Sequence, residues 1–68
     1  MDPAACLALR EYLGAKAATL TSLAQDLGVH PATVRSWRDG TNIPRADHAG
    51  RLQARTGGVV RADQWVRP

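Results

Sequence analysis

The residues best suited to bind an anionic partner lie close together between positions 30 and 45. Arg35, Arg38 and Arg45 fall in this stretch, and all basic residues of the chain except Lys16 are arginines. A planar guanidinium forms paired hydrogen bonds with phosphates and with the edge of guanine, whereas a lysine ammonium acts as a point charge. Hydroxyl, amide and imidazole side chains lie in the same stretch. This combination favours an anionic partner.

The overall composition agrees with that interpretation but gives it little weight. The chain has 68 residues, which is enough for one small domain, with a formal net charge of +3 and a pI of about 10.0. A basic balance steers association with anions. Many solvated surfaces carry a similar excess, so the charge alone identifies no partner.

Other classes of function find no support in the residue pattern. Cys6 is the single cysteine, which excludes an internal disulfide, and it is not at metal-ligand spacing with His30 or His48. We therefore expect no metal and no cofactor. No Ser/His/Asp or Cys/His arrangement stands out and the acidic residues are scattered, so we expect no enzyme. Without a signal peptide or a transmembrane run, we expect a cytoplasmic chain with no membrane partner and no small-molecule ligand.

The elements that must position these residues are two short helices within 20–40. In the first, apolar residues recur at helical spacing and form one face. Gly28 then breaks the pattern, since a glycine adopts positive φ at little cost, and Val29 fills the turn. The residues of the apolar face are Leu20, Leu23, Ala24 and Leu27.

A second helix is predicted from Pro31 to Asp39. His30 precedes a proline and therefore suits a position just outside a helix, while Pro31 suits the first turn. Val34 and Trp37 form the buried face, and Gly40 ends the helix. The remaining residues of this helix point outward and are available for contacts.

Further helices are predicted on both sides of this pair. The first begins with Asp2 as its N-cap and continues to about Ala17, although Gly14 is a weak point, and its Cys6, Leu9 and Leu13 are core. Thr19 is the predicted N-cap of the helix that starts at Leu20. A fourth helix runs from Pro44 to about Thr56, with an inner face of Ala46, Ala49, Leu52 and Gln53. His48 is expected at the surface.

The residues of 20–40 resemble the helix-turn-helix of bacterial and phage DNA-binding regulators. The match rests on Leu23, Ala24, Leu27, Gly28, Val29, Val34 and Trp37. The ending Trp37-Arg38-Asp39-Gly40, followed by Ile43-Pro44, resembles the Cro and phage-repressor branch, the XRE type. The resemblance covers about Thr19 to Trp65 and implies an all-α, lambda-repressor-like bundle of four to five helices in a single domain, 1–68. An ordinary αα-hairpin is the alternative interpretation.

The resemblance also implies which residues contact double-stranded DNA. The family's base-reading positions fall on Pro31, Ala32 and Ser36, with His30 and Arg35 beside them. The groups at positions 31, 32 and 36 are small or apolar where the family often has long polar side chains, so specificity depends on Arg35, whose alternative role is a phosphate contact. Phosphate contacts are expected from Thr21, Thr33, Arg38, Asn42 and Arg45.

The function implied by the resemblance is that of a Cro-like transcriptional regulator, a repressor if its site overlaps a promoter. An antitoxin or adaptor that binds proteins through the same fold is the alternative. The tail, residues 57–68, begins with Gly57-Gly58. It either closes the core, with Asp63 capping a last turn, or forms a homodimer contact. The tail residues considered for that contact are Val59, Val60, Trp65 and Val66.

Overall fold

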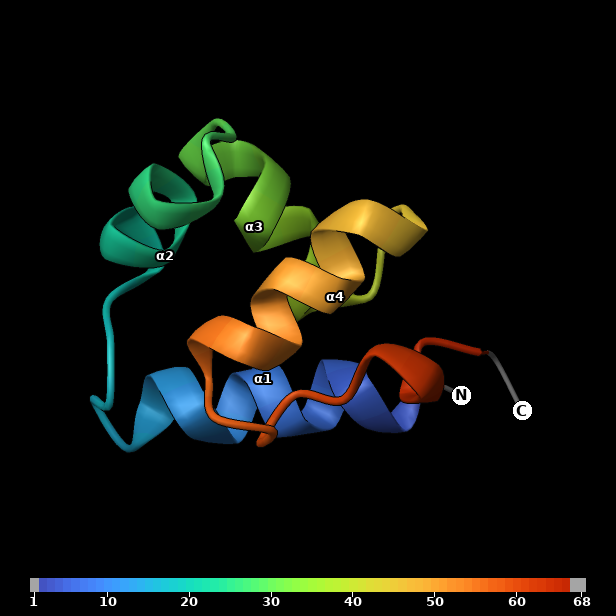
Figure 1. The fold of residues 1–68 in the computed structure, drawn as a ribbon. Coiled ribbons are helices and arrows are strands. Elements are labelled where there is room, and N and C mark those ends of the chain that lie inside the picture. The colour runs from blue at the N-terminus through green and yellow to red at the C-terminus, as the bar shows by residue number, and fades with distance from the viewer. Residues whose placement is uncertain (1, 67–68) are drawn as a thin grey trace.

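A computed structural model describes residues 2–66, which form α-helices and one short 3₁₀ helix without any strand. The elements are α1 (Ala4–Gly14), α2 (Leu20–Leu27), α3 (Pro31–Asp39), α4 (Ala46–Arg55) and the 3₁₀ helix η1 (Ala62–Gln64). Figure 1 shows α1 along one side of the molecule, α2, α3 and α4 across from it, and the tail running back beside α1. The all-helical prediction is confirmed. No helix in the described part of the chain is long and apolar enough to cross a membrane.

The predicted bounds of α2 and α3 are confirmed, because local signals fix both ends of each helix. Thr19 caps α2 through its side chain, which accepts from the amide of Ser22 at 3.0 Å while the Ser22 hydroxyl accepts from the amide of Thr19. Gly28 ends α2 at φ 70°, and Gly40 ends α3 at φ 81°. Both glycines therefore use the left-handed conformation that a side chain disfavours.

The start and end of α1 differ from the prediction. Pro3 rather than Asp2 occupies the N-cap position, and the carboxylate of Asp2 pairs with Arg10 instead. The helix ends at Gly14, because Lys16 adopts φ 60° and Ala17 donates its amide to the carbonyl of Tyr12 at 3.3 Å. This six-to-one bond is the Schellman end that usually has glycine at the left-handed residue.

The inner face of α4 is narrower than predicted. Ala49 and Leu52 are buried as expected, but Ala46 and Gln53 are exposed. The Gln53 side chain accepts from the amide of Ala62 at 2.8 Å, so this residue holds the tail instead of filling the core. Pro44 is buried before the helix, which begins at Ala46 and ends at Arg55.

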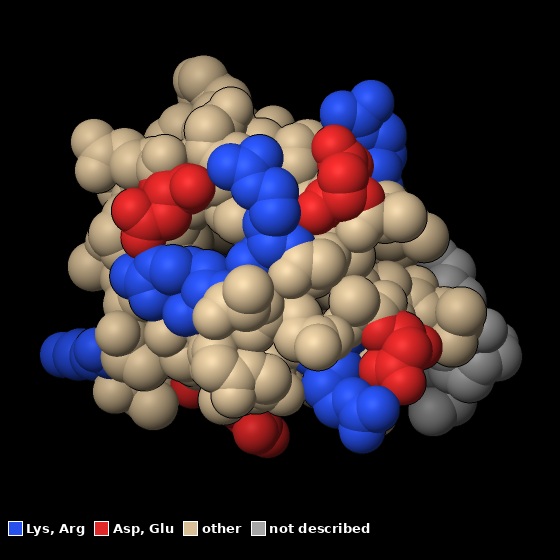
Figure 2. Space-filling view, viewed as in Figure 1, with Lys and Arg blue, Asp and Glu red and all other residues tan. Residues whose placement is uncertain are grey.

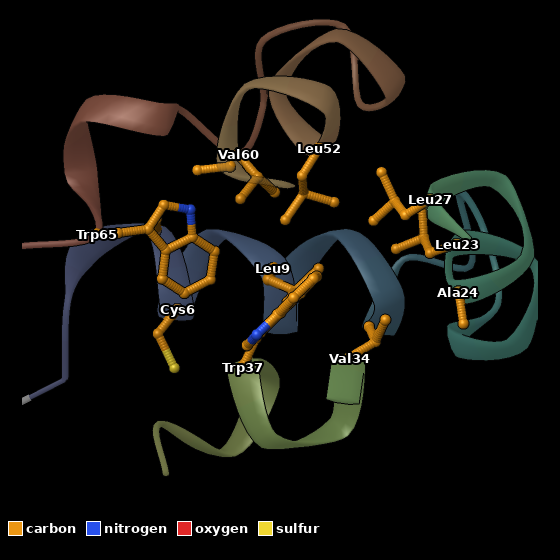
Figure 3. Close-up of a cluster of buried hydrophobic side chains, with 12 residues drawn as sticks. Cys6, Leu9, Leu23, Ala24, Leu27, Val34, Trp37, Leu52, Val60 and Trp65 are labelled. Carbon is orange, nitrogen blue, oxygen red and sulfur yellow. The ribbon is translucent and has the colours of Figure 1, made fainter. Parts of the chain in front are cut away.

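The core is a single cluster to which all four α-helices and the tail contribute (Figure 3). Leu9 of α1 lies in the middle of the labelled side chains, with Trp37 and Val34 of α3 on one side and Leu52 of α4 on the other. Cys6 is fully buried, as predicted for a small core residue. Leu13 is only partly buried and packs against the edge of the cluster.

The tail closes the core through two of its four apolar residues. Val60 and Trp65 are 0% and 4% exposed, whereas Val59 and Val66 are 50% and 73% exposed. Thr56 joins α4 to the tail, since its hydroxyl accepts from the amide of Val60 at 3.1 Å. Core closure by Trp65 is thus confirmed, and a dimer contact remains a prediction that rests on Val59 and Val66 alone. The predicted tail extends beyond the described residues at positions 67 and 68.

The last turn is not capped as the sequence analysis predicted. Arg61 occupies the N-cap position of η1 without a side-chain cap, and Asp63 accepts a hydrogen bond from the Arg61 guanidinium at 2.9 Å. The indole nitrogen of Trp65 is buried and has no hydrogen-bond partner among the described residues. Most buried indole N–H groups find an acceptor. Because the indole of Trp65 has none among the described residues, we attribute its placement to apolar packing.

Candidate functional site

A surface recess of about 660 Å³ lies between α3 and the segment that leads into α4. One wall is formed by α3, as far as Trp37, and the turn before it, and the other by residues 42–45 with the first turn of α4. The recess collects side chains predicted for contacts from both walls. These residues are His30, Ala32, Thr33, Ser36, Asn42 and Arg45.

His30 has a defined role at the entrance of α3. Its Nδ1 accepts a hydrogen bond from the amide of Ala32 at 3.1 Å, so the imidazole acts as the N-cap of the helix. An imidazole that accepts at Nδ1 carries its proton on Nε2, which leaves that nitrogen as a donor. The sequence leaves open whether His30 only shapes the turn or contacts phosphate or base, and this geometry allows both.

Trp37 and His48 form the boundary between the recess and the core. Their ring centroids are 5.9 Å apart with a 42° angle between the planes. Trp37 is 3% exposed, as predicted for a core residue. His48 is partly buried against it, which corrects the expectation of a surface residue without a partner. No sequence signal marked this contact, because it joins two helices across a loop.

The hydroxyl of Ser36 is already engaged within α3. Ser36 Oγ donates to the carbonyl of Thr33 at 2.7 Å, and the side chain is partly buried. A serine that bonds to its own helix backbone offers a weaker donor to a ligand. The wall that α3 contributes to the recess is therefore poorer in free donors than its sequence suggests.

The C-terminal end of α3 is held by α1. The carbonyl of Arg38 accepts from Arg10 Nε at 2.8 Å and from Cys6 Sγ at 3.1 Å. The Arg38 guanidinium donates to Asp39 at 2.9 Å, and this hydrogen bond holds the pKa of the Asp39 carboxyl below its usual value. The hydrogen bond that Arg10 donates to the carboxylate of Asp2 raises the pKa of Arg10. These contacts tie the last turn of α3 to α1.

Most basic side chains in the described part of the chain are paired with an aspartate, so few of them are available to a ligand. Within residues 2–66 every aspartate pairs with an arginine, and the Arg45–Asp47 pair is the longest of these at 3.8 Å. Figure 2 shows one face of the molecule, where acidic side chains lie beside or near most of the basic ones. Lys16, Arg35 and Arg51 form no salt bridge within the same residues. Of these, only Arg35 lies on α3, where it is exposed.

The remaining predicted contact residues lie outside the recess. Pro31 and Arg38 are partly buried, whereas Arg35 and Thr21 are exposed, Arg35 on α3 and Thr21 in the first turn of α2. Five residues that line the recess were not predicted as contact residues. These are Val29, Trp37, Ile43, Pro44 and His48. Ile43 is the most informative of them, because its side chain is 46% exposed.

Comparisons of the chain with protein-family models, with curated proteins and with solved structures gave no significant match.

Proposed function

We propose that this chain binds double-stranded DNA with sequence specificity and acts as a Cro-like transcriptional regulator, a repressor where its site overlaps a promoter. In this proposal α2 and α3 are a helix-turn-helix in a lambda-repressor-like arrangement, and α3 enters the major groove. A major groove about 12 Å wide admits an α-helix. The chain would act in the cytoplasm, where the DNA lies, and by occupancy rather than as an enzyme.

The observation that carries the proposal is the convergence of the predicted contacts around one recess. His30, Ala32, Thr33 and Ser36 come from α3 and its cap, while Asn42 and Arg45 come from the following loop. A helix that reads base edges needs a neighbouring element that contacts the phosphates and sets its position. The loop 41–45 supplies amide and guanidinium donors beside α3, which suits that second role.

The short connection between α2 and α3 supports the same proposal. Gly28 turns the chain at φ 70°, and Pro31 restarts a helix directly after His30. Ala24 is 1% exposed at the α2–α3 contact, where a small side chain lets two helices cross closely. The N-terminal half of α3 remains open to a partner because Val34 and Trp37 are the residues of this helix that enter the core.

Electrostatics favour Arg35 as the residue that reads a base. Arg35 is exposed on α3 and forms no salt bridge within the described residues, so its guanidinium is available to pair with guanine O6 and N7. Arg45 keeps only a long contact to Asp47 and suits a phosphate. The two arginines therefore divide specificity and positioning between them.

Selection of bound sites from a random duplex pool at near-physiological salt tests the proposal. We expect an enriched motif that contains a G, and an affinity that falls steeply with salt as counterions are released. Arg35→Ala should abolish the preference for that G, whereas Arg51→Ala, an exposed arginine of α4 that forms no salt bridge within residues 2–66, should not. A folded protein that enriches no sequence would overturn the proposal.

The second candidate function is a protein-interaction module, such as an antitoxin or adaptor, on the same fold. The observation in its favour is the exposed apolar surface of Val59 and Val66 in the tail. A DNA affinity and specificity that are unchanged in Arg35→Ala would favour it. Loss of partner binding in Val59→Ser would then identify the tail as the contact.

A further inference from the structure

Apolar side chains line the recess on both of its walls and in the turn before α3. Ala32 is exposed there, and Ile43 faces the same recess from the loop with 46% of its side chain exposed. Val29 contributes a third apolar group from the turn before α3 and is partly buried. An exposed isoleucine gains free energy only when an apolar partner covers it.

Two polar side chains on the α3 wall make hydrogen bonds within α3 and its cap. Ser36 Oγ donates to the carbonyl of Thr33 at 2.7 Å, and His30 Nδ1 accepts from the amide of Ala32 at 3.1 Å. The amide of Asn42 and the guanidinium of Arg45, which keeps only a long contact to Asp47, belong to the loop. A base edge that enters the recess between the two walls therefore meets the methyl groups of Ala32 and Ile43, with the donor at His30 Nε2 beside them.

We infer that the recess recognises the 5-methyl group of a pyrimidine, which is thymine in ordinary DNA, and so selects a T·A pair there. This inference rests on the proposed DNA binding and names the base that Ala32 and Ile43 read. The 5-methyl group projects into the major groove, and apolar side chains are its natural contacts. No acidic residue is found among the described residues that line the recess, so the phosphates beside such a base are not repelled.

The expected size of the effect follows from the area of one methyl group. Burial of a methyl against apolar side chains strengthens binding by about three- to fivefold. Uracil has the same hydrogen-bonding groups as thymine and lacks only this methyl. Replacement of thymine by deoxyuridine therefore isolates the apolar contact from every other interaction.

The experiment starts from the duplex that site selection recovers and replaces each thymine by deoxyuridine, one at a time. We expect one position per bound α3 at which affinity falls about three- to fivefold. The wild-type chain, Ala32→Gly and Ile43→Ala are then compared on the thymine and deoxyuridine duplexes at that position. In both variants the ratio of the two affinities should approach one.

Matched controls separate the contact from a loss of stability. Ala54→Gly removes the same methyl from an exposed helical position outside the recess, and Leu7→Ala shortens a side chain that is 49% exposed on α1. Both controls should keep the wild-type ratio between thymine and deoxyuridine. Thermal unfolding of each variant shows that it is folded at the assay temperature.

The outcomes distinguish this inference from the function on which it rests. If a site is enriched but every deoxyuridine duplex binds within twofold of its parent, methyl recognition is overturned and DNA binding stands. The same holds if the deoxyuridine effect persists unchanged in Ala32→Gly and Ile43→Ala, because the methyl is then read elsewhere. If no site is enriched, both proposals fall together.

Discussion

The guanidinium of Arg10 donates its Nε–H to the main-chain carbonyl of Arg38 at 2.8 Å, which ties α1 to the last turn of α3. The other end of the same guanidinium binds Asp2 at 2.7 Å. Asp2 in turn lies against the α-carbon of Gly40, where a Cβ would meet its Oδ1 at 2.5 Å. One arginine thus joins the start of the chain to the residue that ends α3.

Substitution of Arg10 should destabilise the protein more than substitution of an arginine without these contacts. Arg10→Ala leaves the Arg38 carbonyl without its charged donor and Asp2 without its partner. We expect a lower Tm than that of Arg51→Ala, which removes an exposed arginine from α4. Equal melting temperatures for the two variants would show that the Arg10 contacts do not stabilise the fold.

Gly40→Ala should cost more stability than Gly28→Ala. Both glycines have positive φ, 81° and 70°, so each alanine incurs about 1–2 kcal/mol of backbone strain. At Gly28 nothing lies within 4 Å of an added Cβ, whereas at Gly40 the carboxylate of Asp2 must move away from Arg10. The free energies of unfolding in urea measure the difference between Gly40→Ala and Gly28→Ala. This difference should be smaller when both substitutions are made in an Asp2→Ala background. An unchanged difference in that background would contradict the steric explanation.

Lys16→Gly should stabilise the protein. Lys16 is exposed, is the non-glycine residue with positive φ among the described residues, and ends α1 at φ 60°. Glycine adopts this conformation without strain, so we expect a gain of about 1 kcal/mol in the free energy of unfolding. Ala15→Gly is the matched control, because Ala15 has φ −76° in the helical region and its replacement should destabilise. A loss of stability in Lys16→Gly would show that the lysine makes a compensating contact.

Stability should fall in mild acid through Asp39 and Asp47. A hydrogen bond from Arg38 lowers the pKa of Asp39, and the backbone amide of His48 lowers that of Asp47. Because both folded-state pKa values lie below the unfolded ones, their contribution is complete above about pH 5 and is lost as the pH falls through 4. Unfolding in urea between pH 6 and 3 measures this loss, which should be smaller in Asp39→Asn. An identical pH profile for that variant would exclude Asp39 as a source.

The sequence predicted α2 and α3 well because each end carries its own local signal. Each end is set by a residue that acts on its immediate neighbours in the chain, so its effect does not depend on how the other helices pack. These residues are Thr19, Gly28, Pro31 and Gly40. The predicted end of α1 was wrong because no such local signal marks it. Alanines around Lys16 favour a helix, and nothing in a lysine announces a left-handed conformation.

The sequence predicted part of the lining of the recess but not its shape. The ten proposed contact positions follow from the helical phase of α3 and from the resemblance, and six of them meet in the recess. The roles of His48 and Ile43 depend on how the loop 41–45 brings α4 beside α3, which no residue spacing encodes. The internal bond of Ser36 was also invisible, since a serine on a helix can point either to a ligand or to its own backbone.

The buried thiol of Cys6 can serve as a probe of how often α1 and α3 separate. Cys6 is 0% exposed and its Sγ donates to the Arg38 carbonyl, so a thiol reagent reaches it only when α1 separates from α3. No other cysteine competes for the reagent. The rate of alkylation under native conditions therefore measures how often the contact between α1 and α3 opens. Comparison with the rate of global unfolding tells whether α3 detaches from α1 alone or only when the whole core unfolds.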